Sequence, residues 1–191
     1  MIVPVVEGQS EERAIGALMR RVLYELGVFD LSVSRPLRVK RQRVVREGEL
    51  ERTIIQAERS RAGAWSVFIV LDADEACPAD LGLILLQRAR AQTNLAVRVV
   101  LPKVEIEAWI LAGVDSLRGV CGIRGDAEPP PYPETIRDAK GALTRLMEDR
   151  RGYVATDDLP ALVEQLDLDL TQERSPSFAK FRRDLTSLAH A

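Results

Sequence analysis

The chain has few of the residue types on which many common sites depend. Its 191 residues include two cysteines, Cys77 and Cys121, and a single histidine, His190. Two isolated cysteines without a nearby histidine cannot build a disulfide framework or a structural zinc site. A histidine next to the end of the chain, where ends usually fray, argues against Ser-His or Cys-His catalysis. Any catalysis would therefore depend on carboxylates, lysine, arginine or a metal ion.

Long apolar runs are also missing. No uninterrupted apolar stretch approaches the roughly 20 residues of a membrane-spanning helix. The N-terminus lacks the basic region and the cleavage site of a secretory signal. We therefore expect a cytoplasmic protein without membrane contact. The chain is 46% apolar and 29% charged, which is in the normal range for a folded globular protein.

The order of the apolar segments predicts alternating strands and helices in the first part of the chain. Strands are expected at residues 2–6, 31–39, 65–71 and 95–101, and helices at residues 11–26, 48–61, 78–93 and 103–112. The segment 65–71 is apolar at almost every position, as in a central strand covered on both faces. This order predicts an α/β domain with a mainly parallel sheet and helices on both faces.

The composition of the sequence changes after Gly119. Glycines and prolines there mark a loop or linker, and helical patterns follow near residues 134–150, 158–166 and 177–189. We therefore expect two parts, an α/β domain at residues 1–118 and a helical C-terminal extension at residues 119–191 that packs on it.

Acidic residues follow three of the predicted strands. Glu7 ends the first, Asp72 and Asp74 end the central one, and Glu105 and Glu107 follow a third. Ligands of parallel sheets bind at the carboxyl ends of the strands, so we expect these acids at one sheet edge. An extended backbone would point Asp72 and Asp74 to the same side. Like charges gathered there favour a hard cation such as Mg²⁺ or Mn²⁺, as one ion or two. Alternatively, each acid is a solvated or capping residue at the end of a strand.

Five short motifs contain these acids or follow them in the chain. They are Val6-Glu7-Gly8-Gln9-Ser10-Glu11, Leu71-Asp72-x-Asp74, Glu105-Ile-Glu107-Ala-Trp109, Pro133-Glu134-x-Ile136-x-x-x-Lys140 and Ser175-Pro-Ser177-Phe178. The first two resemble the TOPRIM fold of topoisomerases, DnaG-type primases and overcoming-lysogenization-defect nucleases. All five, in order, resemble the bacterial domain-of-unknown-function 4276 family, a TOPRIM-like group. The resemblance covers nearly the whole chain and implies a Rossmann-like TOPRIM domain.

The resemblance also implies roles for the acids. In the TOPRIM fold, a Glu after the first strand and an Asp-x-Asp after a later strand coordinate Mg²⁺ for phosphodiester chemistry. Glu7, Asp72 and Asp74 are therefore the expected metal ligands and catalytic residues. Glu107 is the expected additional ligand, preferred to Glu105 because the family match includes Glu107-Ala-Trp109.

Lys140 is the expected phosphate contact, because its motif resembles one in which a C-terminal lysine completes a nuclease site. The alternative is an ion pair within its own segment, with Glu134 or with the neighbours of Asp138. Trp109 is expected in the core rather than stacked on a base, since it shares a helical face with Ile106 and Ile110.

Residues 35–46 carry six cations and no acid. Within them, Arg38, Lys40, Arg41 and Arg43 are the expected contacts to a nucleic-acid backbone, which needs charge but no base recognition. The alternative is an exposed charged edge strand that resists pairing with other chains.

These observations lead to one main functional hypothesis and two alternatives. The main hypothesis is a Mg²⁺- or Mn²⁺-dependent nuclease or related phosphoryl-transfer enzyme acting on DNA or RNA, which the resemblance places in a bacterial defence system. The second is a non-catalytic TOPRIM-like module that partners an ATPase. The chain has no Gly-x-x-x-x-Gly-Lys-Ser/Thr loop, so an ATP-driven step would need a separate subunit. The third is a small-nucleotide phosphatase or nucleotidyl-transfer enzyme. The oligomeric state is left open.

Overall fold

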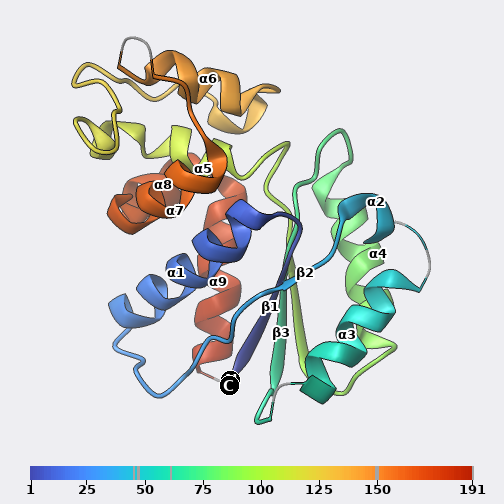
Figure 1. The fold of residues 1–191 in the computed structure, drawn as a ribbon. Coiled ribbons are helices and arrows are strands. Elements are labelled where there is room, and N and C mark those ends of the chain that lie inside the picture. The colour runs from blue at the N-terminus through green and yellow to red at the C-terminus, as the bar shows by residue number, and fades with distance from the viewer. Residues whose placement is uncertain (45, 47, 61, 149–150, 191) are drawn as a thin grey trace.

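A parallel sheet forms the centre of the protein (Figure 1). The computed structural model describes the chain except residues 45, 47, 61, 149, 150 and 191, and except the side chains of Arg41, Gln42 and Ser60. Within the described residues, four strands pair in parallel in the order β2-β1-β3-β4. They are β1 (Ile2–Val6), β2 (Leu37–Arg38), β3 (Ser66–Val70) and β4 (Ala96–Val100). The prediction of a mainly parallel sheet is confirmed.

Helices surround this sheet. They are α1 (Gln9–Glu25), α2 (Arg41–Val44), α3 (Glu49–Ser60), α4 (Pro78–Arg90), α5 (Glu107–Ala112), α6 (Ala139–Leu146), α7 (Ala155–Gln165), α8 (Leu168–Arg174) and α9 (Pro176–Ala189), with 3-10 turns η1 (Val114–Leu117) and η2 (Pro133–Thr135). No described helix is both long and apolar enough to cross a bilayer.

The two faces of the sheet pack against different helices. In β3, Phe68 and Val70 belong to a core shared with α1 and α9, whereas Val67 and Ile69 belong to a second core shared with α3 and α4. Figure 1 shows these two pairs of helices on opposite sides of the strands. Successive strand residues point to opposite faces, so a strand buried on both faces is apolar throughout. This is why apolar and polar residues do not alternate in the segment around β3.

Two predicted elements of the first part differ from the structure. The strand predicted at residues 31–39 is reduced to β2 and one bridge between Val33 and Ile2. Pro36 precedes β2 and has no N–H group for a neighbouring strand. The helix predicted from residue 103 begins only at Glu107, because Val104 has a φ of 66°, in the left-handed region that a right-handed helix excludes. The basic segment 35–46 contains the short helix α2 rather than a continuous edge strand.

The C-terminal part also differs in detail from the predicted pattern. The helix expected from residue 134 is divided into η2 and α6, and α6 begins after Asp138, whose carboxylate accepts a hydrogen bond of 2.8 Å from the N–H of Gly141. Helix α8 has no counterpart in the predicted pattern. Arg21 of α1 donates to the carbonyl groups of Val163 and Leu166, at 2.6 and 2.9 Å, and so ties α1 to the end of α7. The division after residue 118 stays a prediction.

Candidate active site

The loops after β3 and β4 hold each other at the carboxyl edge of the sheet. The N–H groups of Ala73 and Asp74 donate to the carbonyl groups of Pro102 and Val104, at 2.9 and 3.0 Å. The N–H of Ile106, at the start of α5, donates to Asp72 Oδ1 at 2.9 Å. The carboxylate of Asp72 is therefore anchored at the N-terminus of the helix that carries the next acid.

The pKa values of Asp72 and Glu107 are both raised. Glu107 is completely buried, and its Oε1 accepts a hydrogen bond of 3.1 Å from the hydroxyl of Tyr153. Burial raises the pKa of Glu107, against the charge of Lys140. Burial, followed by the charges of Glu107 and Glu11, raises the pKa of Asp72 well above its ordinary value. These acids therefore resist being ionised together unless a cation joins them.

Lys140 lies on the other side of Glu107. Its Nζ is 2.7 Å from Glu105 Oε1 and 3.4 Å from Glu107 Oε2. Burial alone would lower the pKa of Lys140, but the charges of Glu107 and Glu105 outweigh it and raise that pKa. The partners of Lys140 thus come from the start of α5 and the loop before it, and not from Glu134 or the neighbours of Asp138 in its own segment. Because its pKa is raised, the Lys140 ammonium stays charged at neutral pH.

The two glutamates that the sequence could not distinguish have different contacts. Glu105 Oε2 accepts from the backbone N–H groups of Ala139 and Lys140, at 3.1 and 3.4 Å, so Glu105 holds the N-terminus of α6. Glu107 is the acid whose charge raises the pKa of Asp72. Glu107 thus acts on Asp72 through its charge, whereas Glu105 contacts Lys140 and the start of α6.

Two further members of this cluster were not predicted. Glu11 lies in the first turn of α1, and its Oε2 is buried without a hydrogen-bond donor. A Cβ atom at Gly8 would collide with this carboxylate, so a glycine at position 8 leaves room for it. Glu11 is the last residue of the first motif and could have been found there, although a first-turn acid is usually explained by the helix dipole. Tyr153 lies in a loop, and no sequence pattern indicates it.

Glu7 lies beside three of the predicted nucleic-acid contacts. It lines a pocket of about 460 Å³ together with the predicted nucleic-acid contacts Arg38, Lys40 and Arg43. The other residues that line it are Val39, Glu49, Arg52, Thr53 and Gln56. The pocket thus places Glu7 beside cations.

The remaining predicted site residues are placed as follows. Asp74 is exposed and has a φ of 48°, so the extended backbone that would align it with Asp72 is absent. The side chain of Arg41 lies outside the described residues, and its backbone begins α2. Lys40 and Arg43 are exposed, and neither has an ion-pair partner among the described side chains. These two cations are therefore available to an anionic ligand.

The last two motifs contact each other. Glu134 Oε1 accepts from the hydroxyl of Ser175 at 2.5 Å and from the N–H and hydroxyl of Ser177 at 2.8 and 2.6 Å. Trp109 is buried, as predicted, and its Nε1 donates to Ser177 Oγ at 2.7 Å. Together these bonds attach the start of α9 to α5. The motifs around Glu134 and Ser177 thus have a structural explanation.

The donor chemistry of the cluster suits a hard divalent cation. Glu11, Asp72 and Glu107 supply carboxylate oxygens, which Mg²⁺ and Mn²⁺ prefer. Among the described residues, Glu11 Oε2 and Glu107 Oε2 are buried and accept no hydrogen bond, and only Glu107 Oε2 faces a cation, Lys140 at 3.4 Å. In the part of the chain that is described, however, no three Asp, Glu, His or Cys side chains already lie around a common ion position. Binding an ion would thus require these carboxylates to adjust.

Comparison with known proteins identifies a family. The model of the family described as Domain of unknown function (DUF4276) matches residues 6–186, so the chain belongs to this family. No curated protein and no solved structure matches the chain.

Proposed function

We propose that this DUF4276 protein is a Mg²⁺- or Mn²⁺-dependent phosphoryl-transfer enzyme of TOPRIM-like type that acts on a nucleic acid. The supporting observation is the cluster of Glu11, Asp72 and Glu107. These acids come from three separate parts of the chain, and two of their oxygens are buried without a hydrogen-bond donor. Such a cluster raises the energy of the folded protein unless a cation or a proton enters it. The position of this cluster next to the charged Lys140 favours a catalytic role.

The basic pocket beside Glu7 supports a polyanionic substrate. Arg38 ends β2, Lys40 and Arg43 follow it, and Glu7 follows β1 directly, so the pocket opens at the carboxyl ends of the strands, where Asp72 also lies. Cations in such a position hold phosphate groups through charge, without reading bases. A nucleic-acid strand crossing this edge would contact the cations and reach the acidic cluster.

Each residue of the acidic cluster and its surroundings then has a defined role. Glu107 and Asp72, with Glu11, would hold the ion, and Glu7 and Asp74 remain proposed ligands on the sequence pattern. A bound divalent ion would offset phosphate charge and activate the attacking water. Lys140 stays protonated and would neutralise charge that develops on a phosphate oxygen. Tyr153 orients Glu107 through its hydroxyl, and Glu105 orients Lys140.

Cleavage assays with matched variants test this proposal. End-labelled single- and double-stranded DNA and RNA are incubated with the purified protein and Mn²⁺. The Asp72→Asn and Glu107→Gln exchanges are combined, and Glu75→Gln serves as the control. Glu75 lies in the same loop, but its side chain is 81% exposed. The double variant should lose cleavage and Mn²⁺ binding measured by calorimetry, while Glu75→Gln retains both.

The double variant should remain folded. Each exchange removes an acid whose pKa is raised by desolvation, so the free energy of unfolding should stay equal or increase at pH 8. Cleavage of any of the four substrates by the folded double variant would refute the proposal. Competition by mononucleotides but not by DNA or RNA would shift the substrate class to small nucleotides.

A further inference from the structure

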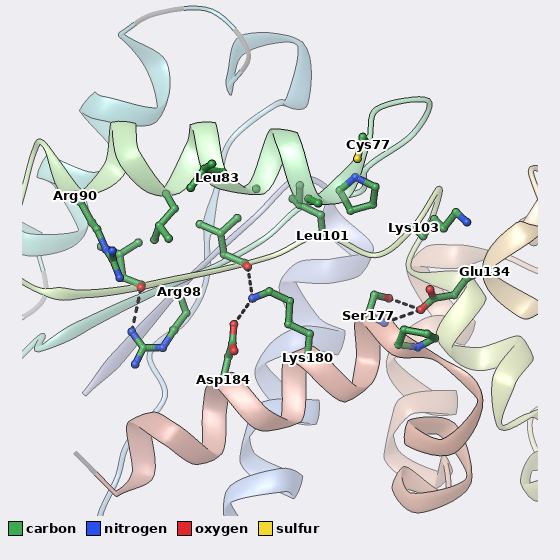
Figure 2. Close-up of a pocket in the computed structure, with 17 residues that line it drawn as sticks. Cys77, Leu83, Arg90, Arg98, Leu101, Lys103, Glu134, Ser177, Lys180 and Asp184 are labelled. Carbon is green, nitrogen blue, oxygen red and sulfur yellow. Dashed lines mark hydrogen bonds and ion pairs between the residues drawn. The ribbon is translucent and has the colours of Figure 1, made fainter.

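A groove lies between α4 and α9, away from the acidic cluster (Figure 2). Its volume is about 780 Å³, within the range of ligand-binding pockets. None of Glu11, Asp72, Glu107 and Lys140 lines it. The strand β4 lies between the two helices and contributes Val97, Arg98 and Val99 to the lining, and Leu101 follows the strand directly. The groove therefore follows the edge of the sheet.

The edge of β4 is closed by side chains instead of another strand. Within the described residues β4 pairs with β3 on one side and is the last strand of the sheet. On the other side, Val99 O accepts a hydrogen bond of 2.8 Å from Lys180 Nζ, and Val97 O accepts one of 3.2 Å from Arg98 Nη1. Figure 2 shows both interactions in the groove. Long cationic side chains at a sheet edge prevent indiscriminate strand pairing, and they can swing away.

The wall of the groove on α4 is apolar. Ala79, Gly82, Leu83 and Leu86 line it at helical spacing. Leu83 is 57% exposed, so apolar surface is available to a ligand. A Cβ atom at Gly82 would lie in ordinary contact with Leu101 Cδ1, at 3.8 Å, so the glycine adds no bulk to this wall. A ligand that places apolar side chains against this helix would remove this surface from water.

Cations predominate at the ends of the groove. Arg90 and Arg98 lie at one end and Lys103 at the other (Figure 2). No carboxylate among the described side chains pairs with any of these three. Of the two acids in the lining, Asp184 pairs with Lys180, and Glu134 accepts hydrogen bonds from the serines at the start of α9. The charge of the groove thus complements a ligand that carries carboxylates.

We propose that the groove binds an extended segment of a partner protein, in which apolar and acidic residues alternate, as a fifth strand on β4. The N–H groups of the segment would replace Lys180 and Arg98 at Val99 O and Val97 O. The two released cations would then face its carboxylates. A second copy of this chain fits less well, because the β4 edge is recessed between α4 and α9 (Figure 2). A copy would bring its own two helices against these, whereas a single segment is narrow enough to enter.

Peptide binding to the full chain tests this inference, independently of any cleavage activity. The probe is a fluorescein-labelled octapeptide of alternating glutamate and valine, and its affinity is measured by anisotropy. Leu83→Ser should weaken binding about tenfold, the loss expected when one leucine contact is removed. Ile84→Ser is the control, because Ile84 is 51% exposed on the same helix but does not line the groove. It should leave the affinity unchanged.

Three further probes separate strand addition from other modes of occupation. The same peptide with an N-methyl group on every backbone amide cannot donate to the β4 carbonyls and should not bind. A lysine–valine octapeptide should bind at least tenfold more weakly than the glutamate–valine one. Equal binding of either comparison peptide would overturn the inference. So would displacement of the probe by decanoate, or a dimer in analytical ultracentrifugation that Leu83→Ser dissociates, since each assigns the groove to a different occupant.

Discussion

Replacing Lys140 by methionine tests how the buried acids are kept ionised. Methionine retains the apolar stem of the side chain and removes the charge that faces Glu107 at 3.4 Å and Glu105 at 2.7 Å. At an effective dielectric constant of about 20, the closer approach corresponds to about 6 kcal/mol and the longer to about 5 kcal/mol. Desolvation of the ions and the 44% exposure of Lys140 offset much of this. Loss of one partner from a largely buried pair still costs about 3 kcal/mol, the decrease expected in the free energy of unfolding at pH 8.

The pH dependence of this decrease follows from the pKa of Glu107. Without Lys140, the pKa of Glu107 in the folded state rises further above its unfolded value, because the opposing charge is gone. The destabilisation of Lys140→Met is therefore complete above the pKa that Glu107 has in the folded variant, and it decreases as the pH falls through this pKa. Urea unfolding, followed by circular dichroism in EDTA at pH 8 and pH 5, should show a smaller loss at pH 5.

Lys180→Met is the matched control. Lys180 is 43% exposed and pairs with Asp184, but this acid keeps 15% exposure, whereas Glu107 has none. The control should lose at most about 1 kcal/mol, with little change between the two pH values. Equal losses for the two variants, or a loss for Lys140→Met that does not depend on pH, would refute the proposed ionisation of the cluster.

Three other changes probe contacts around the site and the core. Tyr153→Phe removes the donor to Glu107 Oε1 and should lower stability by about 1 kcal/mol in thermal unfolding, whereas Tyr132→Phe, at a 74% exposed position, should not. Arg88, at 2.7 Å, lowers the pKa of Glu51 to about 2, so Glu51 stabilises the fold above about pH 4.5 and this contribution is lost as the pH falls toward 2. Glu51→Gln should therefore flatten the acid limb of a urea stability profile, and an unchanged limb would exclude this pair as its cause. Glu134→Gln weakens three hydrogen bonds at the start of α9 and should destabilise the protein by about 2 kcal/mol, with faster amide exchange concentrated in residues 175–180. Uniformly faster exchange would indicate a global effect instead.

The strands and helices of the sheet could be predicted because burial on both faces of the sheet requires a recognisable pattern of apolar residues. The central strand must be apolar at every position, and the helices around it keep one apolar face. The predicted bounds of the elements are wrong where the backbone departs from regular helix or strand geometry. The left-handed Val104 delays α5, and Pro36 shortens the pairing around β2, yet neither changes the apolar pattern that predicts the elements.

The candidate site was predictable in part for a related reason. The carboxyl ends of parallel strands meet at one edge, so Asp72 and Glu107 could be expected near each other from their positions alone. The choice between Glu105 and Glu107, two residues apart, depends on the turn before α5. The alignment of Asp74 depends on its own left-handed φ. Both are local conformations that the residue types do not specify.

By itself, the sequence determined the apolar segments of the core, the parallel arrangement of the sheet and the position of acids directly after its strands. These properties follow from hydrophobic periodicity and chain connectivity, which every segment carries locally. Only the tertiary structure decided that Glu11 and Tyr153 join the acidic cluster, that Glu7 lies among arginines and lysine, and that β4 faces a groove. Those contacts join residues distant in the chain, and the shapes of the loops between them determine which side chains meet.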